Sequence, residues 1–137
     1  MSVVIIDYGS GNLRSAARAF ERGVAEDGLS LSVEVSADPD KVRKASHVVL
    51  PGVGAFADCR AGLMALDGMA DALQEAVQVE AKPFLGSCSG MQLMAKLGLA
   101  HCLHQGFSCL LGTVRPLLPR HNTLKIPHLD WNQLARN

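Results

Sequence analysis

The 137-residue sequence predicts an α/β fold: a doubly wound, mostly parallel sheet with helices on both faces. Two observations support this fold class. Short apolar segments alternate with segments of helical periodicity as far as residue 97, and several of the apolar segments end in glycine-rich loops. Strand–helix alternation of this kind generates parallel strands joined by crossovers of one hand. The length and an apolar content of 48% fit a single domain, residues 1–137.

The chain begins with a strand, a turn and a helix. Ser2–Ile6 is a β-branched run without polar alternation, which is typical of a parallel strand buried on both faces. A turn follows at residues 7–12. Apolar residues then recur at helical spacing, at Leu13, Ala16, Ala17, Phe20 and Val24. A dinucleotide-binding turn is disfavoured, because Arg14 stands where that motif needs its third glycine.

Two further strands and a short helix are predicted next. Residues 31–36 alternate between apolar and polar, so we expect a strand near the edge of the sheet. Pro39–Lys44 is predicted to be a short helix, because Asp38 is a favourable N-cap and proline suits the first helical position. His47–Leu50 is a third buried strand, and it ends in the loop Pro51-Gly52-Val53-Gly54.

The second half contains one more helix and strand before the pattern changes. The helix is indicated by Met69, Ala72, Leu73, Ala76 and Val77. A short apolar strand follows from Pro83, and a helix-favouring segment begins after residue 90 and runs to Ala95. Residues 98–112 are mixed in character. We expect short strands at 113–118 and 124–126, added antiparallel at an edge of the sheet.

The segment Gly86-Ser87-Cys88-Ser89-Gly90 lies between a predicted strand and a predicted helix. It is the cysteine counterpart of the G-x-S-x-G nucleophile elbow, in which flanking glycines let strand and helix approach closely. At a helix start, the dipole and unpaired N–H groups favour a thiolate. The N–H of Ser89 would be placed to stabilise an oxyanion. A buried structural cysteine in a glycine-rich turn is the alternative interpretation.

Composition excludes several classes of function. The net charge is zero, which gives no electrostatic footprint for nucleic acid. We find no membrane-spanning segment and no basic-then-apolar N-terminus, so we expect a cytoplasmic protein with reduced cysteines. His101, Cys102, His104 and Cys109 fit no familiar zinc spacing, and we expect neither a metal nor a cofactor.

Four ordered segments resemble the class I glutamine amidotransferases, and more narrowly the glutaminase subunits of imidazole glycerol phosphate synthases. The segments are residues 7–15, 51–56, 83–95 and 125–132. The resemblance implies a flavodoxin-like fold and hydrolysis of glutamine through a thioester on Cys88. The ammonia would pass to a separate (β/α)8-barrel cyclase of histidine biosynthesis, with no nucleic acid or membrane involved.

The resemblance also implies roles for individual residues. Gly54 would help bind glutamine or form the oxyanion hole together with the Ser89 N–H, and Gln92 would contact glutamine. Asn12, Ser15 and Trp131 would lie toward the cyclase.

The chain departs from the family pattern near its catalytic groups. The family completes its triad with a His-x-Glu pair near the C-terminus, but no glutamate follows Cys88 here. His128 and Asp130 have a similar spacing, yet they belong to the fourth matching segment, so a substitute pair is disfavoured. Ser87 and Ser89 stand where the family prefers apolar residues.

We therefore expect a domain incomplete at its C-terminus, with an exposed apolar face or sheet edge, and inactive or impaired by itself. Two alternatives stay open. One is a non-catalytic remnant that docks on the cyclase. The other is a DJ-1/PfpI-like cysteine-elbow protein.

Overall fold

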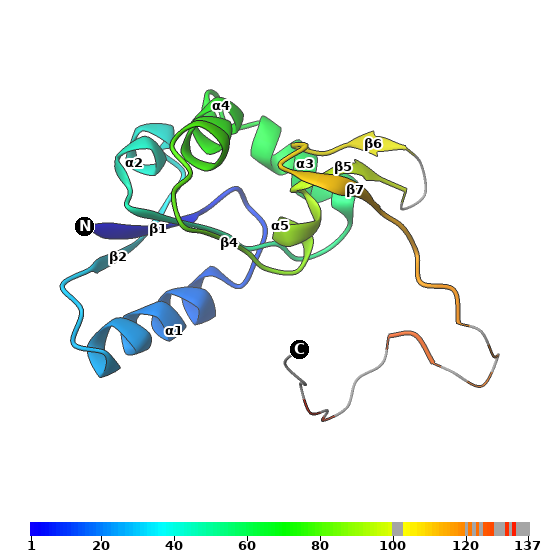
Figure 1. Cartoon of the computed structure of the whole chain (residues 1–137), viewed down its shortest axis with the longest axis horizontal. Helices are drawn as coiled ribbons and strands as arrows, with labels where there is room; N and C mark the ends of the chain where they lie inside the picture. Colours follow the sequence, from blue (N-terminus) through cyan, green and yellow to red (C-terminus); the bar gives the residue numbers. More distant parts are fainter. Residues whose placement is uncertain are drawn as a thin grey trace.

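The main sheet has four parallel strands in the order β2-β1-β3-β4 (Figure 1). They are β1 (Ser2–Ile6), β2 (Ser32–Ser36), β3 (His47–Leu50) and β4 (Phe84–Gly86). The predicted parallel sheet is confirmed, with β2 at its edge. The computed structural model describes residues 1–99, 103–119, 121, 123, 125–127, 131 and 133.

The strand order changes direction at β1, because β2 lies on one side of it and β3 on the other. At such a switch point, neighbouring connections cross to opposite faces of the sheet. They leave a crevice at the carboxyl ends of the strands, where ligands bind in open α/β folds. The loop after β1 (residues 7–12) and the loop after β3 (residues 51–55) meet at the carboxyl ends of the strands. Cys88 follows β4 beside these loops.

The sheet packs a different apolar core against each face. In β1, Val3 and Ile5 face α1 (Leu13–Glu26), whereas Val4 and Ile6 face the opposite side. The opposite side is covered by α2 (Pro39–Lys44), α3 (Phe56–Met64) and α4 (Met69–Gln74). Helices on both faces are therefore confirmed (Figure 1). None of the helices in the described ranges has the length and apolar character that a membrane span requires.

Two helices begin where the sequence predicts, at capping side chains. The Asp38 carboxylate accepts a hydrogen bond of 2.9 Å from the Asp40 N–H, and Pro39 occupies the first helical position of α2. At the start of α1, the Asn12 side chain accepts from the Ser15 N–H at 3.4 Å. The caps satisfy amide groups that have no acceptor within their own helix.

Three elements between β3 and β4 replace the single predicted helix. Besides α3 and α4, a π-helical stretch, η1 (Glu75–Val79), follows α4 directly. The sequence prediction missed α3. Its buried residues, Phe56, Cys59 and Leu63, do recur at helical spacing, but small and charged residues between them weaken the pattern.

The chain after the elbow differs from the prediction. The helix predicted there is a single turn, α5 (Ser89–Gln92), and the chain turns into a strand, β5 (Ala95–Gly98). A Cβ at Gly98 would lie 2.8 Å from the Phe56 ring, so β5 packs closely on α3. Because of this packing, the chain forms β5 where the predicted helix would have continued.

The later strands form a separate three-stranded sheet and not an antiparallel extension of the main one. β5 pairs in parallel with β7 (Leu110–Val114) and antiparallel with β6 (His104–Gln105). The strand predicted at 113–118 is therefore shifted toward the N-terminus and ends at Val114. Of the strand predicted at 124–126, residues 125 and 126 are not in a strand, and residue 124 lies outside the described residues.

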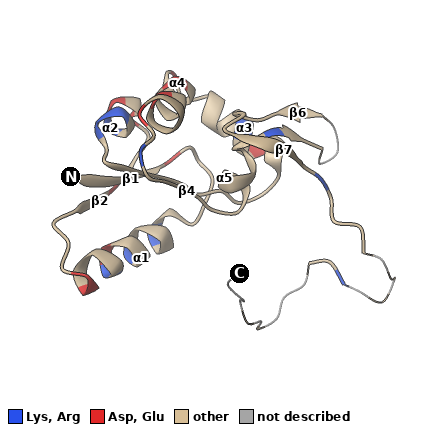
Figure 2. Cartoon of the chain, in the orientation of Figure 1, with Lys and Arg blue, Asp and Glu red and all other residues tan. Residues whose placement is uncertain are grey.

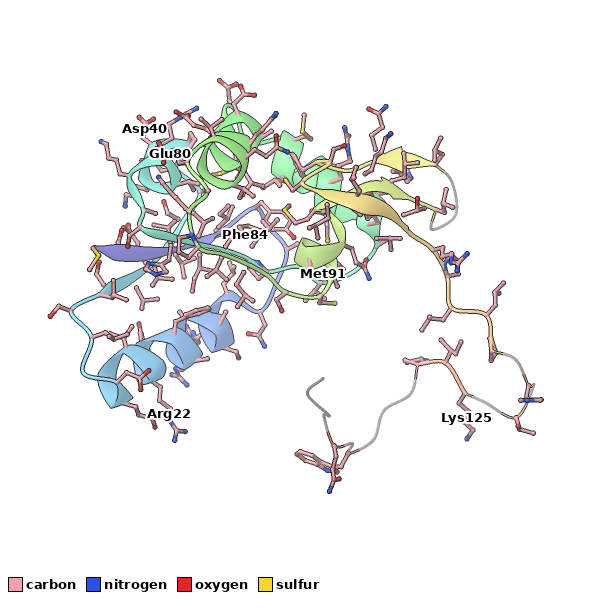
Figure 3. The ribbon with its side chains drawn as sticks, viewed as in Figure 1. Arg22, Asp40, Glu80, Phe84, Met91 and Lys125 are labelled. Carbon is pink, nitrogen blue, oxygen red and sulfur yellow. The ribbon has the colours of Figure 1, made fainter. Side chains whose placement is uncertain are left out.

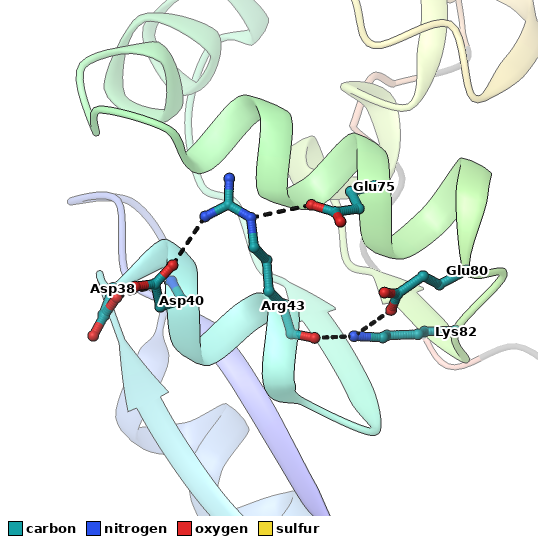
Figure 4. A network of polar contacts seen from close by, with 6 residues as sticks. All are labelled: Asp38, Asp40, Arg43, Glu75, Glu80 and Lys82. Atoms are coloured by element: carbon teal, nitrogen blue, oxygen red, sulfur yellow. Dashed lines mark hydrogen bonds and ion pairs between the residues drawn. The ribbon is translucent and has the colours of Figure 1, made fainter.

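Charged residues lie mainly on the helices, whereas β4 and α5 contain none (Figure 2). One network joins α2 to the segment that leads into β4 (Figure 4). Arg43 pairs with Asp40 and Glu75, each at 3.1 Å, and Lys82 pairs with Glu80 at 2.6 Å while donating to the Arg43 carbonyl. The ion pairs of Arg43 are largely exposed, so each contributes little to stability.

β4 forms an open edge of the main sheet. On its side away from β3, the described residues supply no further strand, and Leu85 is 52% exposed. Phe84 and Met91, both labelled in Figure 3, help to line an apolar pocket of about 290 Å³ on the α4 side of this edge. The exposed sheet edge expected from the sequence is therefore present.

Leu73 and Leu111 offer a test of this core, because the first is fully buried and the second is 95% exposed. The substitution Leu73→Ala should lower the free energy of unfolding by roughly 2–5 kcal/mol, since it leaves a cavity beside α2 and β3. Leu111→Ala should change it by less than about 0.5 kcal/mol. Urea denaturation followed by circular dichroism measures both changes. Equal losses of unfolding free energy would contradict the burial of Leu73 in the core.

Candidate active site

Cys88 adopts a strained backbone conformation between β4 and α5. Its φ of 53° and ψ of −120° lie in a region that residues other than glycine rarely occupy. Such a conformation costs of order 1–3 kcal/mol and persists only where the surroundings enforce it. The thiol is exposed. The structure thus has the sharp strand–helix turn, with Cys88 exposed to solvent, that the glycine-flanked cysteine predicts.

Three glycines allow the backbone segments around this turn to touch. A Cβ at Gly86 would lie 2.7 Å from the Cα of Met91 in α5. A Cβ at Gly90 would overlap the carbonyl oxygen of Leu50 at the end of β3, and one at Gly52 would overlap the backbone nitrogen of Gly90. None of the three neighbours is a flexible side chain, so any larger residue would push the segments apart.

Cys88 opens onto a pocket of about 460 Å³ between α1 and the carboxyl ends of β3 and β4. Asn12 and Ser15, predicted to face a partner, line the same pocket. The wall is otherwise largely apolar and includes Phe20, Val49, Pro51, Val53 and Leu85. The structure therefore brings together a predicted nucleophile and two predicted interface residues from segments more than seventy residues apart.

Gly54 and Ser89 contact each other, but neither they nor the other two predicted residues are among those that line this pocket. The Ser89 hydroxyl donates to the Gly54 carbonyl at 2.7 Å. Gln92, the last residue of α5, is half-buried and is not among the residues that line the Cys88 pocket. The Trp131 side chain is 99% exposed in the C-terminal part of the chain, and it does not line this pocket either.

The loop after β3 is held by side chains that the sequence analysis did not single out. Ser10 uses one hydroxyl to accept from the Val53 N–H at 3.0 Å and to donate to the Val53 carbonyl at 2.7 Å. The Cys59 thiol donates to the same carbonyl at 3.3 Å, and the Tyr8 hydroxyl donates to the Pro51 carbonyl at 2.6 Å. The sequence signal that could have identified these residues is the presence of Tyr8 and Ser10 in the turn directly after the first strand.

The Tyr8 side chain is only 5% exposed, and burial raises the pKa of its phenol well above the ordinary tyrosine value. Its hydrogen bond with Cys59 acts in the same direction. Tyr8 therefore stays protonated in the folded protein and keeps its hydrogen to donate to Pro51.

Within the described part of the chain, Cys88 Sγ has one polar contact, the Ser89 hydroxyl at 3.9 Å. Residues 83–95 include no charged side chain. No described imidazole or carboxylate is therefore hydrogen-bonded to this thiol as a general base. His128 and Asp130, considered above as a substitute pair, lie outside the described residues.

No group of metal-ligating side chains is found among the described residues. Of the four residues considered for a metal, His104 lies in β6 and Cys109 just before β7. His101 and Cys102 lie outside the described residues.

Cys88 lies in a strained turn after β4, beside the loops that follow β1 and β3 at the carboxyl end of the parallel sheet. The family profile "Glutamine amidotransferase class-I" matches residues 4–133. The chain belongs to this family, and the DJ-1/PfpI-like alternative is not favoured.

Among curated proteins, the chain is similar to proteins named imidazole glycerol phosphate synthase subunit HisH. It is 51% identical to the protein of Mesorhizobium japonicum and 53% identical to that of Bradyrhizobium diazoefficiens. Each match covers 98% of this chain and 62% of the relative. The Rhodospirillum rubrum protein is 52% identical, with 63% of it covered. The chain thus spans about three-fifths of the length of these relatives.

The raised pKa of Tyr8 predicts how stability depends on alkaline pH. The unfolded chain loses the tyrosine proton near the ordinary value of 10.0, whereas the folded chain retains it. The contribution is therefore fully present below pH 10 and is lost as pH rises above it. The free energy of unfolding should fall above pH 10, and that of the Tyr8→Phe variant should fall less steeply. Parallel pH profiles for the two proteins in urea titrations would contradict this assignment.

The close approach at Gly90 predicts a large effect of adding one methyl group. Gly90→Ala should destabilise the protein by roughly 1–3 kcal/mol, because the Cβ overlaps the Leu50 carbonyl at the end of β3. Gly112 is the matched control, since a Cβ there meets nothing within 4 Å. Thermal unfolding of both variants provides the comparison. Equal melting temperatures would contradict the close backbone contact at Gly90.

Proposed function

We propose that this chain is a glutaminase subunit of an imidazole glycerol phosphate synthase, in which Cys88 attacks the side-chain amide of glutamine. The observation that carries the proposal is the strained, solvent-exposed Cys88 at the mouth of the pocket beside α1. Membership of the amidotransferase family and similarity to HisH subunits support the same substrate.

The proposed reaction has two halves. The Cys88 thiolate adds to the amide carbon of glutamine, giving a tetrahedral oxyanion. Collapse breaks the C–N bond, and the nitrogen takes up a proton and leaves as ammonia. Water then adds to the thioester, and cleavage of the C–S bond releases glutamate and restores the thiol.

Backbone N–H groups are the proposed donors to the oxyanion. Ser89 is the first residue of α5, so its N–H has no acceptor within the helix. In the loop after β3, the Val53 N–H already donates to Ser10. The Val53 carbonyl is held by Ser10 and Cys59, and in a planar trans peptide the Gly54 N–H points the opposite way. This geometry supports Gly54 as the second donor.

We propose that the ammonia is used by a (β/α)8-barrel cyclase in the cytoplasm and that the two subunits form a heterodimer. Asn12 and Ser15 line the same pocket as Cys88, so a partner placed over them would stand next to the site of ammonia release. Trp131 is the proposed third contact, because its large side chain is exposed to solvent. Gln92 is proposed to contact glutamine on the basis of the motif alone.

A cysteine nucleophile needs a base, and among the described residues no imidazole or carboxylate is hydrogen-bonded to Cys88. We therefore expect glutamine turnover by this chain alone to be impaired. A docking subunit without catalytic activity is the second candidate, and it rests on this one observation.

Labelling with a chloroketone analogue of glutamine distinguishes these candidates, with mass spectrometry locating the label. We expect modification at Cys88, faster with a cyclase subunit present, and none in Cys88→Ser. The analogue one methylene shorter should react about 10-fold more slowly, because a shaped pocket discriminates at that level. Cys109, a free and half-buried thiol, is the internal control for non-specific alkylation.

Docking without labelling would favour the non-catalytic subunit. Equal labelling of Cys88 by the long and short analogues would contradict a glutamine pocket. Failure to bind any cyclase subunit would contradict both candidates.

A further inference from the structure

Ser89 occupies an unusual place for a polar side chain, directly after the nucleophile and only 2% exposed. Its hydroxyl lies 2.7 Å from the Gly54 carbonyl oxygen, which is a strong contact between the elbow and the loop after β3. A carbonyl oxygen carries no proton. Ser89 must therefore be the donor in this hydrogen bond.

The same hydroxyl lies 3.9 Å from Cys88 Sγ. A serine has one hydrogen to donate and two lone pairs to accept with. Because that hydrogen is directed to Gly54, Ser89 can only accept from the thiol and cannot also donate to a thiolate. Anchoring the loop and stabilising the thiolate are thus competing uses of one proton, and the shorter contact favours the loop.

The loop is held from its other side by Ser10, which contacts both the N–H and the carbonyl of Val53. Between these two serines, Gly54 has a φ of +100°, which other residues rarely adopt. The Ser10 contacts tie the loop to the turn after β1, whereas Ser89 alone among the described side chains hydrogen-bonds it to the elbow. Gly52 also contacts the elbow through its backbone, and Ser89 adds the side-chain link that fixes the Gly54 end of the loop relative to Cys88.

We propose that Ser89 is a positioning residue that fastens the 51–54 loop to the elbow and so shapes the pocket in front of Cys88. The inference rests on the proposed function, since the pocket matters only if Cys88 acts on a bound substrate. An apolar residue at position 89 could not make this link, because it has no hydrogen-bond donor.

The test compares two reagents on Cys88. Methyl methanethiosulfonate contacts only the thiol, whereas the chloroketone analogue of glutamine must also fit the pocket. In Ser89→Ala, labelling by the analogue should fall about 10-fold, while the rate with the small reagent changes less than about 2-fold. Ser89→Thr retains the hydroxyl and should keep the ratio of the two rates.

Ser46→Ala is the matched control. The Ser46 hydroxyl also donates to a carbonyl, that of Ser2 at 2.8 Å, but at the amino ends of β1 and β3, away from the elbow. Its loss should affect stability and leave the ratio of the two labelling rates unchanged.

Amide hydrogen exchange gives a readout that needs no substrate. The Val53 N–H lies in the same loop and is hydrogen-bonded to Ser10, so its exchange should accelerate about 10-fold in Ser89→Ala and not in Ser46→Ala.

Unchanged exchange at Val53, or labelling rates that fall together with both reagents, would overturn the inference. The second result would mean that the hydroxyl serves the thiol itself. If the unaltered chain shows no preference for the glutamine analogue over its shorter homologue, the proposed function fails, and the exchange experiment still decides whether Ser89 anchors the loop.

Discussion

The site depends on direct contact between backbone segments at the carboxyl end of the sheet. Gly52 contacts Gly90 in the elbow, Gly86 contacts α5, and Gly90 contacts the end of β3. None of these distances leaves room for a Cβ. This contact holds Cys88 in a conformation that an isolated peptide would avoid. The energy that maintains the strain comes from the packing of the core on both faces of the sheet, and the glycines transmit that packing to the turn.

Hydroxyl groups supply the polar counterpart of this contact. Ser10 and Ser89, from turns after the first and the last strand of the main sheet, both bind the loop after β3. Tyr8 and Cys59 add hydrogen bonds from the α3 side. The pocket wall is therefore positioned by four side chains that come from three different segments, although none of the four carries a formal charge. Neutral groups of this kind hold a loop without adding a field that would compete with a developing oxyanion.

Much of the fold could be predicted because its signals are local. The β-branched runs, the Asp38 cap and the glycine-flanked Cys88 each act within a few residues. The predictions failed where distant contacts decide. The chain leaves the helical state after Gln92 because Gly98 packs on Phe56 and β5 pairs with β7, and neither contact is visible in the segment itself. Likewise, the family resemblance implied that Gly54 and Ser89 contribute separately to one site, but not the hydrogen bond that joins them.

The open edge at β4 has a geometric consequence. Its last residue, Gly86, stands two positions before Cys88, so any strand that extends the sheet at this edge comes to lie alongside the nucleophile. Hydrogen bonding along β4 would also cover Leu85, which forms part of the pocket wall. A strand added at this edge would therefore both extend the sheet and cover part of the pocket wall in front of Cys88.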